Sequence, residues 1–96
     1  MENVVYLELL RRDYQVYVGS DTEGEVDFIA QNASGLHYFQ VSETTLQTET
    51  LERELKPLKK IRDSYPKTLL TLDEVGVEAD YEGIKKINAL KWLLRD

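Results

Sequence analysis

The residue types that could do chemistry lie together in one predicted hairpin, residues 23–42. Two segments alternate apolar and polar residues, and the polar sequence QNASG between them predicts a turn. Antiparallel pairing through that turn places Asp27 beside Gln40 on one face of the hairpin. A carboxylate is a ligand type that Mg²⁺ favours, and an amide oxygen is a weaker one. Any active site in this chain is therefore expected on that face.

The same pairing divides the hairpin into an apolar side and a more polar side. A slip of one residue would mix the two sides, so the pattern itself selects the register. We expect the apolar side to face the core, and the side with Asp27 and Gln40 to form the back of the hairpin. The expected pairs are Val26–Val41, Phe28–Phe39 and Ala30–His37 on the apolar side, and Glu25–Ser42, Asp27–Gln40 and Ile29–Tyr38 on the other.

The remaining segments predict the elements that position this hairpin. Apolar residues recur at helical spacing between Leu51 and Ile61, and Pro57 inside this pattern is expected to kink or loosen the helix. Asn88 is a suitable N-cap for the last helix. The order αβββαβ plus a short βα predicts an α/β (α+β) fold with a mixed sheet. We expect helices at 2–12, from 44 or 48 to 65, and at 89–95, strands at 14–19, 67–72 and 84–88, and an acidic loop at 73–83.

The composition narrows the class of protein. The chain has 96 residues, no cysteine and a formal net charge of −6, so it forms one domain without a disulfide framework or a thiolate zinc site. No apolar run approaches the roughly 20 residues of a membrane span, and the N-terminus lacks a basic leader. We expect a cytoplasmic protein. Because the first helix begins almost at Met1, we also expect the chain to be a piece of a longer protein.

Basic residues form two groups in this acidic chain. The negative net charge argues against a stand-alone nucleic-acid binder, since phosphate contacts need clustered Lys and Arg. Solvated helix or strand surface is the simpler interpretation of both groups, and DNA binding through the first group stays open. The first group is Lys56, Lys59, Lys60 and Arg62, and the second is Lys85, Lys86, Lys91 and Arg95.

The chain also resembles a known family. The phrases ENVVYLELLRRDYQVYVG, EVDFIAQ, YFQVSET and YPKTLLTLDE are similar, in their order and spacing, to a nuclease-like domain of unknown function. That domain is found at the C-terminus of many prokaryotic AAA+ ATPases, and its element order is that of the PD-(D/E)xK nuclease superfamily. The resemblance implies a single restriction-endonuclease-like domain over residues 1–96, with the rest of a parent ATPase as its partner.

The resemblance also assigns positions to the nuclease site. Glu8 matches the glutamate of the first helix, and Asp27 matches the metal-binding aspartate. Gln40 and Ser42 depart from the pattern, because they stand where the nucleases have a second carboxylate and a catalytic lysine. Hydrolysis of a phosphodiester in this way needs Mg²⁺ held by at least two carboxylates, and loss of one preorganised group typically costs about 2.7–4 kcal/mol of transition-state stabilisation. The departures imply a nuclease fold with a degenerate active site, in which Glu25 could act as a substitute carboxylate.

Three functions remain open at this point. The first is a non-catalytic accessory domain of an AAA+ ATPase that docks partners, assists oligomerisation or contacts DNA through the basic helix, and needs no cofactor. The second is a Mg²⁺-dependent DNA nuclease with a variant site of Glu8, Asp27 and Glu25. The third is nucleic-acid binding without cleavage through the first basic group. The chain contains no G-x-x-x-x-G-K-[ST] sequence, so any ATPase activity is expected in another part of the parent protein.

Overall fold

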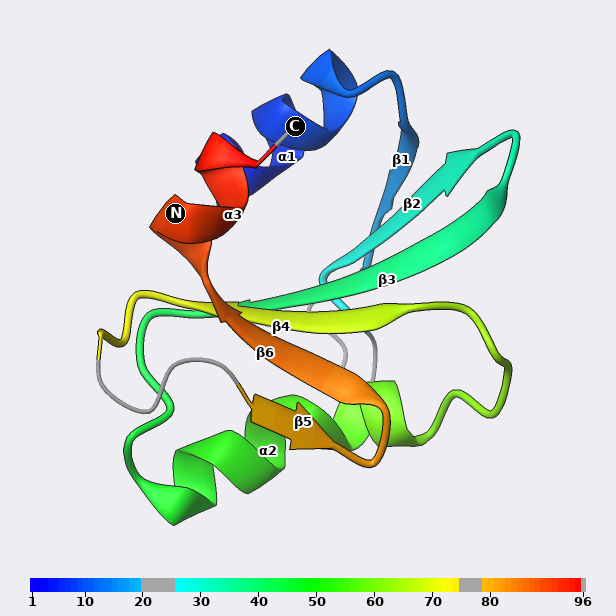
Figure 1. The fold of residues 1–96 in the computed structure, drawn as a ribbon. Helices are drawn as coiled ribbons and strands as arrows, with labels where there is room; N and C mark the ends of the chain where they lie inside the picture. The colour runs from blue at the N-terminus through cyan, green and yellow to red at the C-terminus, as the bar shows by residue number, and fades with distance from the viewer. Residues whose placement is uncertain (20–25, 75–78, 96) are drawn as a thin grey trace.

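The computed structural model describes residues 1–19, 26–74 and 79–95. Six strands form one mixed sheet in the order β1-β2-β3-β4-β6-β5, and three helices pack against it (Figure 1). The predicted α/β class is confirmed, and the order αβββαβ is compatible with a restriction-endonuclease-like fold. The elements are α1 (Glu2–Arg11), β1 (Gln15–Val18), β2 (Phe28–Asn32), β3 (Gly35–Ser42), α2 (Thr48–Lys59), β4 (Lys67–Thr71), β5 (Ala79–Tyr81), β6 (Ile84–Asn88) and α3 (Ala89–Leu94).

Helices cover both faces of the sheet. α1 and α3 lie on one face, and α2 lies on the other (Figure 1). Consecutive strand residues point to opposite faces, so Phe39 packs in the α1/α3 cluster whereas Tyr38 packs in the α2 cluster. Gln40 lies on the side of the hairpin opposite Phe39, as expected, but α2 covers this side, so Gln40 is only 7% exposed and donates to Glu54.

The central hairpin has the predicted register. Phe28 pairs with Phe39, and the other pairs of β2 and β3 follow the same register around a two-residue turn at positions 33 and 34. Gly35 follows the turn with φ +130°, a conformation that favours glycine. The alternation of apolar and polar residues was therefore sufficient to fix this pairing.

The start of the hairpin differs from the prediction. The strand was expected from residue 23, but β2 begins at Phe28, and residues 20–25 lie outside the described part of the chain. Val26 was expected opposite Val41 on the α1/α3 side, but it packs in the α2 cluster. A bend at Asp27 separates Val26 from the strand, so the alternation of sides does not extend to it.

The segment from β3 to β4 crosses over through α2. β3, β4 and β6 are mutually parallel, and all five residues of β4 are buried, as its apolar sequence predicted. α2 begins at Thr48 rather than Thr44, and it ends at Lys59, soon after Pro57. The expected extension to residue 65 is therefore wrong. The helix stops where a proline has removed a main-chain donor from its last turn.

The last third of the chain contains one strand that was expected to be loop. Ala79–Tyr81 forms β5, which pairs antiparallel with β6 through a turn at Glu82 and Gly83, both with positive φ. Residues 75–78 lie outside the described part. Asn88 caps α3 as predicted, since its Oδ1 accepts the main-chain N–H of Lys91 at 3.1 Å. None of the described helices is long and apolar enough to cross a membrane.

Candidate functional site

Asp27 and Gln40 lie side by side where β2 begins and β3 nears its end. Gln40 Oε1 accepts the main-chain N–H of Asp27 at 3.0 Å, and Asp27 Oδ2 accepts the main-chain N–H of Val41 at 2.9 Å. From the other end of its amide, Gln40 Nε2 donates to Glu54 Oε2 of α2 at 3.0 Å. The two side chains therefore join the two strands and the covering helix.

The residue type at position 40 matches these contacts. An amide can accept from Asp27 and donate to Glu54 at once, whereas a carboxylate is an acceptor only. A glutamate at position 40 would also place a second negative charge beside Glu54, which disfavours ionisation of both groups. The departure from the nuclease pattern thus coincides with a requirement of the local hydrogen bonding.

The other positions on this side of the hairpin have separate surroundings. Ser42 Oγ donates to the main-chain oxygen of Thr44 at 2.9 Å, so the hydroxyl stabilises the segment that follows β3. Glu25, the proposed substitute carboxylate, lies outside the described residues. Of the carboxylates predicted for this site, the structure therefore describes only Asp27 beside Gln40.

Glu8 makes its contacts within the helical layer. Its Oε2 lies 2.7 Å from Arg11 Nη2 and 2.6 Å from Arg12 Nε, and its side chain is 12% exposed. Hydrogen bonds from Arg11 and then Arg12 lower the pKa of Glu8 to about 2. Arg12 also donates to the main-chain oxygen of Trp92 at 2.8 Å and lies over the indole ring. Glu8 thus orients the arginine that fastens α1 to α3.

A hollow of about 320 Å³ lies beside the end of β3 and the start of α1. It is lined by Glu2 and Glu43 together with Met1, Asn3 and Val41. Glu2 of α1 and Glu43 therefore lie near the same end of β3, beside Val41. The sequence analysis missed Glu2, since an acidic residue in a first helical turn is common at any helix start.

The described residues do not form a fitted Mg²⁺ site. Within residues 1–19, 26–74 and 79–95, no three or more His, Cys, Asp or Glu side chains gather closely enough to hold a metal ion. One oxygen of Asp27 and the single oxygen of Gln40 already accept main-chain hydrogen bonds. No step of metal-dependent hydrolysis can be derived from this arrangement.

A buried polar network that the sequence analysis missed lies at the carboxyl ends of β3, β4 and β6. Asp73 accepts from Thr44 Oγ1 at 2.6 Å and from the main-chain N–H of Thr45 at 2.8 Å. Lys86, 5% exposed, donates to Thr45 Oγ1 at 3.2 Å, and Asn88 Nδ2 donates to the main-chain oxygen of Asp73 at 2.9 Å. Burial raises the pKa of Asp73, but hydrogen bonds from Thr44 and Thr45 outweigh it and hold that pKa below its usual range.

This network is structural rather than a binding site. Ligands often bind at the carboxyl ends of parallel strands, but Asp73 is 6% exposed and both oxygens of its carboxylate accept hydrogen bonds from Thr44 and Thr45. No buried side-chain polar atom among the described residues lacks a hydrogen-bond partner. Asp73 could not be found from the sequence, because it begins a segment whose acidic composition predicts a solvent-exposed loop.

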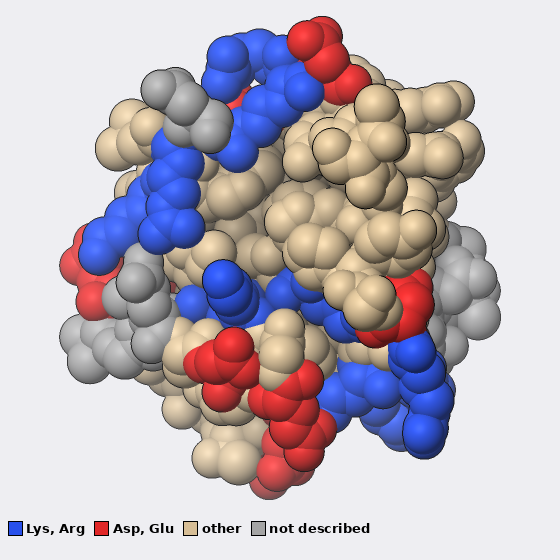
Figure 2. All heavy atoms as spheres, turned by 45° about the vertical axis from the view of Figure 1, so that its right-hand side comes forward, with Lys and Arg blue, Asp and Glu red and all other residues tan. Residues whose placement is uncertain are grey.

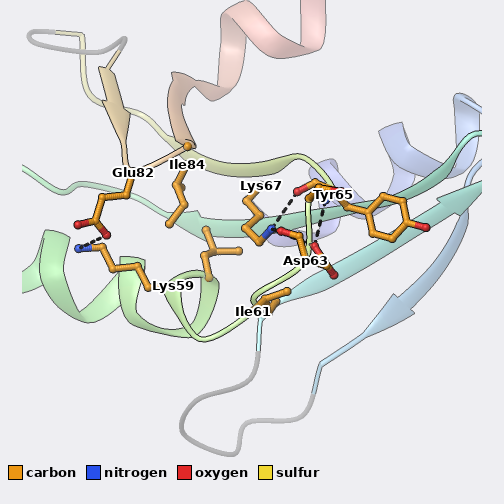
Figure 3. Close-up of a pocket in the computed structure, with 10 residues that line it drawn as sticks. Lys59, Ile61, Asp63, Tyr65, Lys67, Glu82 and Ile84 are labelled. Carbon is orange, nitrogen blue, oxygen red and sulfur yellow. Dashed lines mark hydrogen bonds and ion pairs between the residues drawn. The ribbon is translucent and has the colours of Figure 1, made fainter.

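A second hollow, of about 270 Å³, lies at the opposite ends of β4 and β6 (Figure 3). Lys67 Nζ donates to Asp63 Oδ1 at 3.0 Å and to the main-chain oxygens of Asp63 and Tyr65, both at 2.9 Å. Tyr38 Oη donates to Asp63 Oδ2 at 2.6 Å, which raises the pKa of Tyr38 to about 12. All three protons of Lys67 are therefore engaged in holding the segment that follows α2, and none remains for a ligand.

The two basic groups differ in their surroundings. The first group, Lys56, Lys59, Lys60 and Arg62, is exposed at the end of α2, and Lys59 Nζ lies 3.8 Å from Glu82 Oε2. In the second group, Lys85, Lys86 and Arg95 line one hollow together with Asp80, and Lys86 is buried whereas Lys85 and Lys91 are exposed. Figure 2 shows Lys and Arg in separate groups on the visible face, with Asp and Glu between them.

Comparison with known proteins connects the chain to one longer protein. A curated protein of Haemophilus influenzae, described as uncharacterized, is 36% identical to the chain over 99 residues. The match spans 99% of this chain and 23% of that protein, so the chain spans about a quarter of the length of the relative. No protein-family model matches the chain, and no solved structure matches it.

Proposed function

We propose that this chain is a nuclease-like C-terminal domain of a longer AAA+ ATPase, in which the fold is kept and the nuclease chemistry is lost. The domain acts by contacting partners, and any catalysis belongs to the rest of the parent protein. The match to about a quarter of a longer relative agrees with a domain of a larger protein. The element order αβββαβ agrees with a nuclease-like fold.

The observation that carries this proposal is the use of Gln40. Its oxygen binds the main chain of Asp27 and its amide nitrogen binds Glu54, so the position of the second nuclease carboxylate serves to join β2, β3 and α2. Ser42, at the position of the catalytic lysine, likewise donates to the main chain of Thr44. Both departures from the nuclease pattern therefore have structural roles of their own.

A metal titration followed by amide chemical shifts tests the loss of chemistry. We expect that millimolar Mg²⁺ or Mn²⁺ produces no saturable shifts confined to Asp27, Gln40, Glu2 and Glu43. Broad, weak shifts spread over the acidic surface are expected instead, because a chain with a net charge of −6 attracts cations without a site.

The Asp27→Asn variant is the matched control for that titration. Saturable shifts around Asp27 in the wild type that vanish in Asp27→Asn would overturn the proposal and support a divalent-metal-dependent nuclease with a variant site. A nuclease assay on the full-length protein, comparing wild type and Asp27→Asn, would then identify the substrate class. Identical titration curves for the two chains support the proposal.

A further inference from the structure

One edge of the sheet, at β1, has no further strand paired to it within the described residues. β1 pairs only with β2 among the described strands, and it forms the border of the sheet in Figure 1. An edge strand presents unpaired main-chain donors and acceptors along its free side. The register of β1 shows which residues present them.

The main-chain groups on the outer side of β1 are those of Val16 and Val18, and the described residues provide no partner for them. Gly19 N donates to the main-chain oxygen of Asp27 at 2.9 Å, and Tyr17 is opposite Ile29 in the same register. In an antiparallel ladder, alternate residues face the partner strand with their N–H and C=O groups. Since Gly19 faces β2, Tyr17 also faces it, and the main-chain groups of Val16 and Val18 point away from the sheet.

The edge lacks the features that usually block pairing. Natural edge strands are commonly protected by lysine, proline or inward-pointing charge, but β1 has the sequence QVYV. The Val18 side chain is 65% exposed and the Tyr17 side chain is 48% exposed. The other edge, β5, has only three residues and carries Asp80 at its centre. The unprotected edge is therefore β1.

An apolar groove of about 380 Å³ lies next to this edge. Its lining includes Tyr17 and Val18 of β1 together with Ile29, Pro57 and Ile61. The groove is on the side of Tyr17 that faces α2, since Ile29 packs against the α2 cluster. A side chain from an added strand would enter it beside Tyr17.

We propose that β1 of a second copy of this chain pairs antiparallel with β1 about a two-fold axis through Tyr17. This register puts Val16 opposite Val18 of the second copy, so that the outward donors and acceptors of each residue meet those of the other. Tyr17 then lies opposite its own copy in a non-hydrogen-bonded pair, where cross-strand side chains are closest. The two sheets become one, and the rings of the two tyrosines cover the two grooves.

The self-complementarity of the edge is the reason to choose a second copy as the occupant. Two outward-facing residues flank one central residue, which is the arrangement a two-fold axis requires. β1 carries no charge, so two copies bring no like charges together within the strand pair despite the net charge of −6. The paired strands are short, and interfaces below about 1,200 Å² are typical of weak complexes. The dimer is therefore expected to depend on concentration.

Sedimentation velocity over a concentration series tests this pairing. We expect the wild type to shift from monomer to dimer as the concentration rises, and Tyr17→Lys and Tyr17→Glu each to weaken dimerisation by at least about tenfold because like charges meet on the axis. An equimolar mixture of the two variants should regain dimerisation, since Lys then faces Glu. An interface elsewhere on the chain would not show this rescue.

Two lysine substitutions of exposed leucines provide controls. Leu46→Lys, at a side chain 69% exposed before α2, should leave the dimer unchanged, and so should Leu7→Lys on α1, at a side chain 62% exposed. A wild type that stays monomeric throughout the series overturns the proposal. Dimerisation that resists Tyr17→Lys, or that is abolished by Leu7→Lys, also overturns it.

Hydrogen exchange in the unmodified chain gives an independent measurement. At low concentration the amides of Val16 and Val18 should exchange freely, whereas those of Tyr17 and Gly19 should be protected by β2. At high concentration the amides of Val16 and Val18 should become protected as the dimer forms. Protection of these two amides that does not change with concentration contradicts the pairing, and this test does not depend on whether the domain binds metal.

Discussion

Single polar side chains in this domain mostly join elements that are far apart in sequence. Gln40 links β3 to α2, Tyr38 of β3 binds Asp63 in the segment that follows α2, and Asp73 binds the segment that follows β3. A buried polar group without a partner typically costs about 1–3 kcal/mol. These residues therefore constrain the fold more than they offer groups for catalysis.

A carboxylate at position 40 is expected to destabilise the chain. Gln40→Glu loses the donor to Glu54 and adds a second carboxylate beside it, so the free energy of unfolding at neutral pH should fall by about 1–3 kcal/mol. Urea unfolding measures the change. Adding Glu54→Gln should recover most of the loss, because the amide then donates to the new carboxylate. Equal stability of Gln40→Glu and wild type would contradict the structural role given to Gln40.

In the folded chain, His37 is expected to stay neutral at pH values well below the usual pKa of histidine. Burial lowers the pKa of His37 from 6.5 to about 4, while Nε2 lies 2.8 Å from Thr68 Oγ1. As the pH falls, the His37 side chain is protonated in the unfolded chain before it is protonated in the folded chain. The contribution of neutral His37 to stability is therefore complete above pH 6.5 and is lost between pH 6.5 and about 4.

The histidine prediction has a direct readout, because the chain contains one histidine. The titration of its ring protons by NMR should give a pKa far below 6.5. His37→Gln should remove part of the loss of stability between pH 6.5 and about 4, as measured by urea unfolding. A ring that titrates near its usual value would show that His37 is solvated.

At the level of elements, the approach of β1 to the start of β2 depends on Gly19. A Cβ atom on Gly19 would lie 1.9 Å from the main-chain oxygen of Val26, which a folded chain cannot accommodate without a shift. We expect Gly19→Ala to reduce the free energy of unfolding by about 1–3 kcal/mol, as overpacked substitutions do. Gln15→Ala, at an exposed position of the same strand, should change it by less than about 0.5 kcal/mol. Equal effects of the two variants would contradict the close approach.

The elements also show what the sequence could and could not predict. The register of β2 and β3 was predictable because side-chain alternation on two faces allows one pairing. β5 was not predictable, since three residues in an acidic segment form a strand only through pairing with β6. α2 begins at Thr48 because the Thr44 hydroxyl binds Asp73, a contact between residues 29 positions apart.

The candidate site was predictable only in part. The pairing pattern correctly predicted that Asp27 lies beside Gln40, although Asp27 lies just before β2 and is held there by hydrogen bonds between side chain and main chain. The location of the α1 acids depends on how α1 docks on the sheet, and helical periodicity gives only its buried stripe, Val5 and Leu9. The sequence therefore does not show that Glu2 lines the hollow beside β3, or that Glu8 binds Arg12, the arginine that contacts α3.

At the scale of the whole molecule, charge distribution limits what the domain can bind. The net charge is −6, and the exposed basic group at the end of α2 has Glu82 beside Lys59. Figure 2 shows acidic groups between the basic ones on the visible face. Non-specific DNA binding requires Lys and Arg side chains to neutralise several phosphates at once. The more phosphates are neutralised, the more steeply the affinity falls as the salt concentration rises.

We therefore expect the chain to hold duplex DNA only at low ionic strength. Fluorescence anisotropy with a labelled duplex should detect binding that disappears at physiological salt. If the contacts come from Lys56, Lys59, Lys60 and Arg62, the slope of log affinity against log salt should not be steeper than about −3.6, since each neutralised phosphate contributes about −0.9. Lys59→Glu combined with Lys60→Glu should abolish the binding, whereas Lys85→Glu, outside this group, should weaken it far less. Binding that persists at physiological salt would contradict this expectation and make nucleic-acid binding a function of the isolated domain, because so acidic a chain would need a built phosphate-binding surface to achieve it.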